Sequence, residues 1–425
     1  MDTKLYIKKR SIYEWLTIYI FLLPFFFGFF IDLLHLPNAI KYTIDIAWVT
    51  IFAVLFLRKK VMLKKNIRPF VIFTGIFFIY TFIVYLFNFQ SPLYYLWGLR
   101  NNFRFYIAFF AFATFLDEYD VDFCFKFIDI AFWIDIAVSL VQYFFFGYNQ
   151  DSLGGIFGVQ KGCNSYQLLL FCFVIAKSLI WYINKKEKLW LCALKSAAVL
   201  IISAMAEMKA FFFLFAVIVI LVMLVTSFSW RKLVLSILGF VLLIVALIVF
   251  SKIFPEWVGK FTMDALYEMA SSDKGYTSSG DLNRLNAIPR LWTEIFDTWY
   301  QRAFGLGLGN CDTSAFSALN TNFFMQYEHL HYTWFHDAFL FLETGIIGVI
   351  TVAGFYGLVY VNAIILKRKN MTVPIYSQFA MVMAIISVFM LIYNSSLRSE
   401  TGYMIYFALA LPFIGLNAST SQKQT

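Results

Sequence analysis

Residues 189–228 read LWLCALKSAAVLIISAMAEMKAFFFLFAVIVILVMLVTSF, two apolar runs separated only by Glu207-Met208-Lys209. Each run has about 20 residues, the length that an α-helix needs to cross a bilayer. Because three residues leave room only for a tight turn, we expect two helices that reverse direction there. This pattern is typical of a helical membrane protein.

The composition extends this interpretation to the whole chain of 425 residues. It is 61% hydrophobic, 21% aromatic and only 14% charged, whereas soluble globular chains are about 25% charged. A soluble enzyme, a disordered chain and a fibrous chain are therefore excluded. We expect an all-α polytopic bundle that forms one membrane domain over residues 1–425.

Further apolar stretches repeat along the chain at the length of a membrane span. We expect twelve spans, at 13–34, 39–57, 69–88, 103–116, 123–147, 164–184, 189–207, 209–228, 233–252, 336–366, 374–393 and 402–416. The first stretch is too long for a signal-peptide core and lacks a small-residue cleavage site, so it is expected to stay as an uncleaved span.

The net charge of +9 reflects topology, because basic residues concentrate in short connections. With the N-terminus inside, more than half of the 34 basic residues fall in cytoplasmic segments. These residues are Lys4, Lys8, Lys9, Arg10, Arg58, Lys59, Lys60, Lys64, Lys65, Arg68, Lys185, Lys186, Lys188, Arg231, Lys232, Lys367, Arg368, Lys369 and Lys423. Both termini are thus predicted to be cytoplasmic, and the charge does not call for a nucleic-acid partner.

A long connection over 252–335 is predicted to be a large extracytoplasmic loop, and loops of this length usually carry function. Helix-like stretches occur within it at Pro255–Met269 and at Arg284–Ala303, the latter interrupted at Pro289. A glycine-rich turn follows at Gly305–Gly309.

A few charged side chains lie on the predicted outer side. Lys209, beside Glu207, could aim a cation at an anionic head group, or it could simply snorkel from an interfacial turn. Arg284 and Arg290 of the long loop could hold phosphate oxygens, for which the planar guanidinium is well suited, or they could be solvated.

Other polar residues are candidates for substrate contacts. Arg100 and Arg104 are four residues apart, on one face of a helix, and could line a cavity or anchor at head groups. Asn164 follows a tight loop that leads into the sixth span. His336 stands at the mouth of a span, where a histidine can act as a general base or merely begin the helix.

The sequence predicts neither a metal nor a cofactor. It contains no zinc-binding spacing of cysteine and histidine, no Walker A motif and no GxGxxG. Asp120-Val121-Asp122 has DxD spacing but falls in a predicted cytoplasmic turn, where we expect it to be solvated. Cys163 and Cys311 both fall in predicted outer loops, so pairing and free thiols both remain open.

Taken in order, these motifs resemble those of the O-antigen ligase/polymerase superfamily, GT-C-like membrane enzymes that transfer lipid-linked glycans. The resemblance lies in the loop 151–164, the turn with Lys209, Arg284, the glycine-rich turn, and the run from His336 through Glu343, Gly345 and Gly348. Lysine replaces the family's usual arginine at the turn. Neither His336 nor His331 stands at the family's usual distance before Gly345, so both remain candidates for the base, with His336 favoured.

The resemblance implies a polymerase of surface polysaccharide repeat units in the bacterial inner membrane, with its active site facing outward. The donor would be a polyprenyl-pyrophosphate-linked oligosaccharide, and a chain-length regulator is a candidate partner. His336 would act as base while Lys209 and Arg284 hold the pyrophosphate, in an inverting reaction without metal. Arg290, Arg100, Arg104, Glu207, His331 and Asn164 would assist in binding.

Two rival functions remain. A ligase that transfers glycan to a lipid core or a protein would share the fold and the residues. A flippase of lipid-linked oligosaccharides would also suit twelve spans, but transporters more often show two similar halves and charges in mid-helix. Here the halves are unlike, and the conspicuous polar groups gather around one loop.

Overall fold

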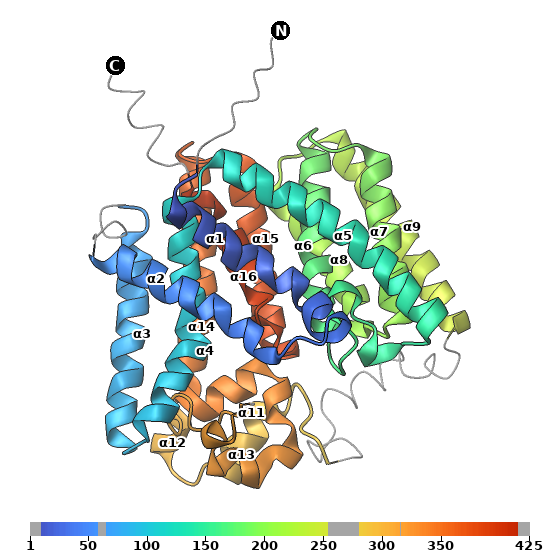
Figure 1. Cartoon of the computed structure of the whole chain (residues 1–425). Coiled ribbons are helices and arrows are strands. Elements are labelled where there is room, and N and C mark those ends of the chain that lie inside the picture. Colours follow the sequence, from blue (N-terminus) through green and yellow to red (C-terminus); the bar gives the residue numbers. More distant parts are fainter. Residues whose placement is uncertain (1–9, 58–64, 254–279, 315, 415–425) are drawn as a thin grey trace, which may run out of the picture.

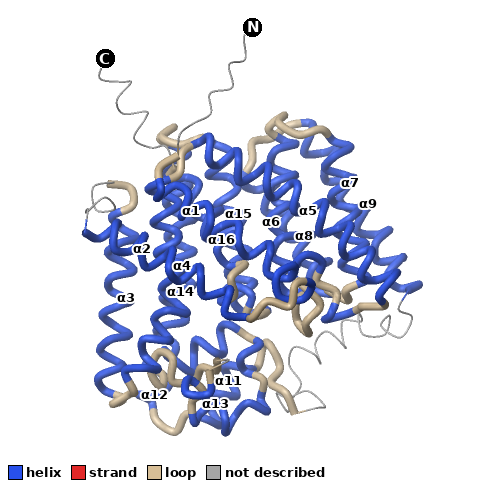
Figure 2. Tube along the Cα trace, in the orientation of Figure 1, coloured by secondary structure: helices blue, strands red, loops and turns tan. Residues whose placement is uncertain are grey.

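The computed structural model describes residues 10–57, 65–253, 280–314 and 316–414. Within these ranges the chain forms helices and no strand, so the predicted all-α class is confirmed for them (Figure 2). The helix expected over Pro255–Met269 lies outside the described residues.

Each of the twelve expected segments contains helix. The helices are α1 (Ile12–Leu22), α2 (Thr43–Leu57), α3 (Arg68–Phe87), α4 (Pro92–Phe115), α5 (Glu118–Phe146), α6 (Asn164–Ile183), α7 (Leu189–Met205), α8 (Lys209–Val225), α9 (Trp230–Ile253), α14 (His336–Arg368), α15 (Pro374–Tyr393) and α16 (Gly402–Ala410). Five are long and apolar enough to cross a membrane: α2 with the 3-10 turn before it, α3, α6, α14 and α15.

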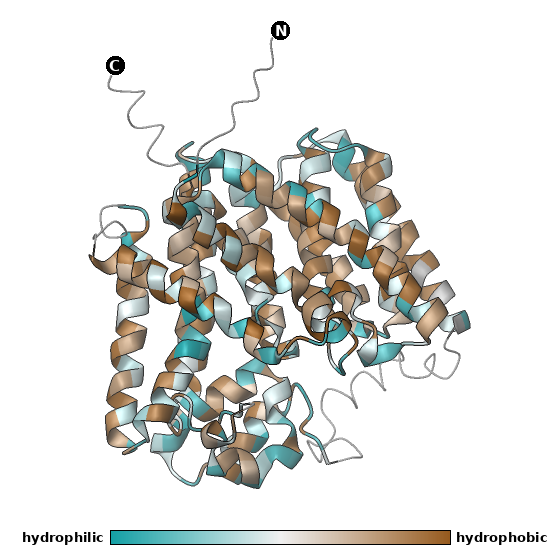
Figure 3. Ribbon diagram, in the orientation of Figure 1, coloured by the Kyte–Doolittle hydropathy of each residue, from teal (hydrophilic) through white to brown (hydrophobic). Residues whose placement is uncertain are grey.

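The outer surface of the bundle supports a membrane environment. On α3 the exposed residues Ile72, Ile76, Ile79 and Ile83 follow one another at helical spacing, and much of the outside of the bundle is apolar (Figure 3). A soluble protein rarely exposes so continuous an apolar face. The interior is equally apolar, and α6 and α15 are largely buried within it.

Two expected segments differ from the prediction. The first is not an unbroken helix over 13–34, because Pro24 lacks the N–H that would continue it; the chain passes into a 3-10 turn at Leu23–Phe26 and a π turn at Phe29–Leu33. The fourth begins at Pro92, well before 103. Proline suits the first position of a helix, so most of the expected loop before 103 is helical.

Asp120 is not solvated as predicted. It lies in the first turn of α5, where it forms a capping box with Asp117, and its carboxylate accepts a 2.7 Å hydrogen bond from Nε of Arg10. The side chain is fully buried.

Short helices cover one end of the bundle. They are α11 (Ala287–Arg290), a π turn at Leu291–Ile295, α12 (Trp299–Phe304) and α13 (Asn322–Tyr327). Figure 1 shows them beside the lower part of α14. Apolar residues of this region, including Leu291 and Phe296, form a second small core with Phe341 of α14. The expected break at Pro289 is absent; the helical stretch is interrupted between Ile295 and Trp299 instead.

The glycine-rich turn fastens these short helices to α14. Leu306 donates its N–H to the carbonyl of Leu342 at 2.8 Å, and the N–H of Gly309 reaches Oε1 of buried Glu343 at 2.8 Å. Gly345 has φ +61°, which interrupts the regular geometry of α14 beside Ala303. Glu343 and Gly345, both marked by the resemblance, therefore serve as structural parts of this junction.

Gly345→Ala should destabilise the protein by about 1–3 kcal/mol, because an L side chain is strained at this φ and its Cβ would overlap the backbone of Ala303. Gly357→Ala in the same helix is the matched control, since its Cβ would meet open space and alanine favours helix. Thermal unfolding in detergent compares the two. Equal melting temperatures for both variants would contradict this role of Gly345.

Candidate functional site

A cavity of about 1040 Å³ lies where several connections meet at one end of the bundle. Its walls come from the segment around Asp32 and Lys41, the loop before α6, the α7–α8 turn, α8, α9, and the link between α15 and α16. It is lined by both charged and apolar side chains, which suits an amphiphilic ligand.

The α7–α8 turn places Glu207 and Lys209 in the cavity wall. Glu207 has φ +50°, unusual for a residue with a side chain, and its carboxylate accepts a 2.8 Å hydrogen bond from Gln150. Asn164 donates to the carbonyl of Ala206 at 3.3 Å and to Asp151 at 3.2 Å. The predicted residues Glu207, Lys209 and Asn164 are thus brought together.

Arg284 lines the same cavity from the region of the short helices. Its Nε donates to the carbonyl of Tyr393 at 3.2 Å, and its guanidinium lies 4.7 Å from the centre of the Tyr393 ring. The structure therefore brings Lys209 and Arg284 to one cavity, as the sequence predicts. Lys41 and Lys161, which the sequence analysis did not single out, also line it.

Four carboxylates line the cavity together with these four cations: Asp32, Asp151, Glu207 and Glu400. Glu400 is the carboxylate among them that pairs with a buried arginine, Arg104. Burial raises its pKa, but the positive charges of Arg104 and Lys41 outweigh this effect, so the pKa is lowered from its ordinary value. Glu400 is therefore ionised at neutral pH.

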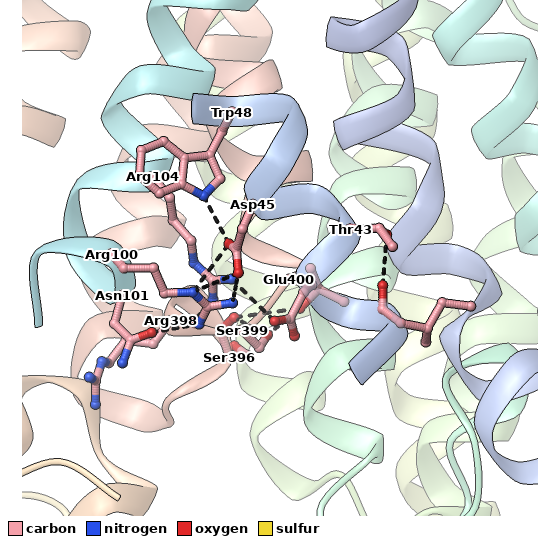
Figure 4. A network of polar contacts seen from close by, with 12 residues as sticks. Thr43, Asp45, Trp48, Arg100, Asn101, Arg104, Ser396, Arg398, Ser399 and Glu400 are labelled. Carbon is pink, nitrogen blue, oxygen red and sulfur yellow. Dashed lines mark hydrogen bonds and ion pairs between the residues drawn. The ribbon is translucent and has the colours of Figure 1, made fainter. Parts of the chain in front are cut away.

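Neither Arg100 nor Arg104 lines the cavity, and both belong to a network of polar contacts in which Arg104 binds the cavity-lining Glu400 (Figure 4). Nη1 of Arg104 lies 3.2 Å from Glu400, and its Nη2 donates to the carbonyl of Arg398 at 2.7 Å. Arg100 binds the carboxylate of Asp45 on α2, with Nη2 to Oδ2 at 2.9 Å. Both arginines of α4 thus act as structural ion pairs.

Sequence reasoning missed Arg398 and Glu400 in the α15–α16 link. Arg398 pairs with Asp312 at 3.2 Å, and Asp312 accepts a 2.6 Å hydrogen bond from Asn101. The sequence did contain a signal for them, because both charges lie in a short polar link between two apolar runs. Their partners lie far away in sequence, so nothing local indicated the pairs.

The remaining predicted residues lie off the cavity. His331 binds Asp281 at 2.6 Å and stacks on Trp334, which does line the cavity. Arg290 pairs with Glu294 one helical turn away. His336 is buried at the start of α14, and its Nδ1 has no hydrogen-bond partner among the described residues. The structure thus does not bring the predicted base to Lys209 and Arg284.

One side of the cavity is apolar. Phe212, Phe213 and Ala216 of α8 face it together with Leu243 and Leu247 of α9. The polar and apolar parts of one ligand could therefore be bound side by side.

Cys163 and Cys311 are both buried and free, so they do not pair. Cys163 lines the cavity, but burial raises the pKa of its thiol to about 12, which makes it a poor nucleophile at neutral pH. Within the described ranges no three or more His, Cys, Asp or Glu side chains are grouped so that they could hold a metal.

A second charged cluster lies inside the bundle, away from the cavity lining. Lys177 and Lys195 both bind Asp129, the latter at 3.0 Å, and Lys195 also lies 3.3 Å from Glu187. These two cations and two anions join α5, α6, α7 and the α6–α7 turn. This cluster was not predicted from the sequence.

Glu400→Gln should destabilise the protein by about 3 kcal/mol, because it leaves the buried guanidinium of Arg104 without its counter-ion. Glu294→Gln, which breaks the more exposed Arg290 pair, is the matched control and should cost less than about 1 kcal/mol. Unfolding in detergent measures both. A larger effect at Glu294 would contradict the assignment.

The same pair predicts acid sensitivity. Because the folded-state pKa of Glu400 is lowered, its stabilisation is complete above the unfolded-state pKa and is lost as the pH falls through the folded-state value. Melting temperatures measured from neutral to acidic pH should therefore fall more steeply for the wild type than for Glu400→Gln. Parallel pH profiles would argue against this carboxylate as the titrating group.

Among known protein families no model matches this chain, and no curated protein matches it either.

Proposed function

We propose that the protein is a glycosyltransferase that polymerises surface polysaccharide repeat units, taking each glycan from a polyprenyl-pyrophosphate donor. The single observation that carries the proposal is the cavity, which Lys209 and Arg284 line together with apolar residues of α8 and α9. A polyprenyl pyrophosphate needs both surfaces, cations for its phosphates and an apolar wall for its chain. The resemblance of the ordered motifs points the same way.

We further propose that all twelve helical segments cross the bacterial inner membrane, with both termini cytoplasmic and the cavity outside. Basic connections meet at one end of the bundle: Arg231 donates to the carbonyl of Tyr182 at 2.9 Å, and Lys367 to that of Val225 at 2.8 Å. The short helices cover the opposite end (Figure 1). This asymmetry fits the positive-inside rule, with 252–335 as the extracytoplasmic loop.

In the proposed reaction an acceptor sugar hydroxyl attacks the anomeric carbon of the donor. The bond from that carbon to the pyrophosphate oxygen breaks, and the configuration inverts. Lys209 and Arg284 neutralise the charge that develops on the leaving group, which lowers the barrier most effectively when they are already in place. Lys41, which also lines the cavity, adds positive charge.

Two groups compete for the proton of the attacking hydroxyl. His336 is the base that the resemblance implies, but only its neighbour Phe335 lines the cavity. Glu207 lines the cavity beside Lys209 and is held in a backbone conformation that residues with side chains seldom adopt, a feature that clusters at functional sites. We therefore propose Glu207 as proton acceptor, with His336 as the alternative.

The transporter class has one observation in its favour. The buried cluster of Lys177, Lys195, Asp129 and Glu187 places charges within the helices, as many transporters do. Its charges balance, however, and none of its members lines the cavity. Movement of lipid-linked substrate across vesicles without formation of a glycosidic bond would favour a transporter. Transfer to a lipid core in place of chain growth would favour a ligase.

Arg284→Ala should abolish long polymer while the protein level stays unchanged, because the leaving group loses a cation. Arg290→Ala, on the same segment but paired with Glu294 away from the cavity, should retain polymer. Gel analysis of the polysaccharide, with immunoblots of both variants, makes the comparison. Full-length polymer from Arg284→Ala would refute the proposed site.

The variants Glu207→Gln and His336→Gln distinguish between the two candidate proton acceptors. Removal of the true proton acceptor should slow polymer formation about 10²–10⁴-fold, since general-base catalysis contributes on that scale. Initial rates of chain growth in membranes, normalised to protein level, give the measurement. If His336→Gln loses activity on this scale and Glu207→Gln does not, the assignment of Glu207 is wrong.

A further inference from the structure

A second cleft lies at the end of the bundle opposite the cavity. It has a volume of about 940 Å³ and opens between the α6–α7 turn, α7 and the beginning of α9. Its rim carries four cations, Lys185, Lys186, Lys188 and Arg231, and one acid, Glu187. No part of the proposed reaction uses this cleft.

The positive charge of the rim is uncompensated. Glu187 is already bound by Lys195 at 3.3 Å and by the hydroxyl of Ser178, so its charge is neutralised inside the bundle. Lys185, Lys186 and Lys188 are exposed, and none forms an ion pair within the described ranges. The cleft therefore presents a site for an anion.

The backbone that carries these lysines is well defined. The N–H of Lys186 donates to the carbonyl of Trp181 at 2.8 Å, and that of Lys185 donates to Tyr182 at 3.1 Å. Arg231 is held over the Tyr182 ring at 5.3 Å and donates to the carbonyl of the same residue. The backbone of Lys185 and Lys186 and the side chain of Arg231 are therefore held in place around the opening of the cleft.

Apolar groups continue the cleft along the helices. Leu189, Trp190 and Ala193 of α7 face Leu238 of α9 within it, and the Trp190 side chain is 62% exposed. Tryptophan is enriched where lipid head groups meet acyl chains. Basic pockets between helices at such an interface bind acidic lipid head groups.

We propose that this cleft binds an anionic phospholipid, with the phosphate among the lysines and Arg231 and one acyl chain along Trp190 and Leu238. The bound lipid would brace α7 against α9. The acyl chain is needed, so a soluble phosphate should not replace the lipid. A net negative head group is also needed to match the cationic rim, so a zwitterionic lipid should not replace it either.

Native mass spectrometry of the full chain in detergent tests the proposal, with phosphatidylglycerol and phosphatidylcholine of identical acyl chains titrated separately. Phosphatidylglycerol should bind more tightly and raise the melting temperature. The triple variant K185Q/K186Q/K188Q should bind it on the order of a hundredfold more weakly at low salt, because each basic residue near an anionic surface contributes about a factor of five.

The control variant K65Q/R368Q/K369Q loses the same charge from exposed positions of other connections that are predicted to lie at this end. It should keep wild-type binding, as should K185R/K186R/K188R, which preserves the cations. If the triple glutamine variant does not fold, K186Q and K188Q singly replace it, each with about a fivefold loss. Equal binding of both lipids, an equal loss in the control, or displacement by glycerol phosphate would overturn the proposal.

Discussion

The ion pair between Arg104 and Glu400 determines where the wall of the cavity lies. Both side chains come from an apolar bundle in which an unpaired charge would be very costly, so each fixes the other. Arg104 also holds the carbonyl of Arg398, and Arg398 in turn pairs with Asp312. These linked ion pairs and hydrogen bonds join α4, the α15–α16 link and the region of the short helices.

The cavity that Glu400 lines combines two kinds of surface. Cations and carboxylates line one part of it, while α8 and α9 supply an apolar wall. Such a site suits an amphiphilic ligand. The opposite end of the bundle is different. There the lysines of the α6–α7 turn are exposed, while Glu187 belongs to a buried cluster in which positive and negative charges balance.

The helices were largely predictable because long apolar runs leave the backbone few alternatives. The structure places the Glu207–Lys209 turn and Arg284, both noted in the sequence for their charge, in the lining of one cavity. The ion pairs were not predictable, because their partners lie far apart in the sequence. Arg104 pairs with Glu400, almost 300 residues later, and Asp120 pairs with Arg10. The same limit explains why the sequence offered Arg100 a place in a cavity or at lipid head groups, whereas the side chain binds Asp45. Pro24 was a visible signal that the first span would break.

Deletion of the gene in its host, followed by analysis of lipid-linked glycans, tests the central claim most directly. If the protein joins repeat units outside the membrane, single lipid-linked units should accumulate on the outer face and long polymer should disappear. Unchanged polymer length, or single units confined to the inner face, would contradict this account.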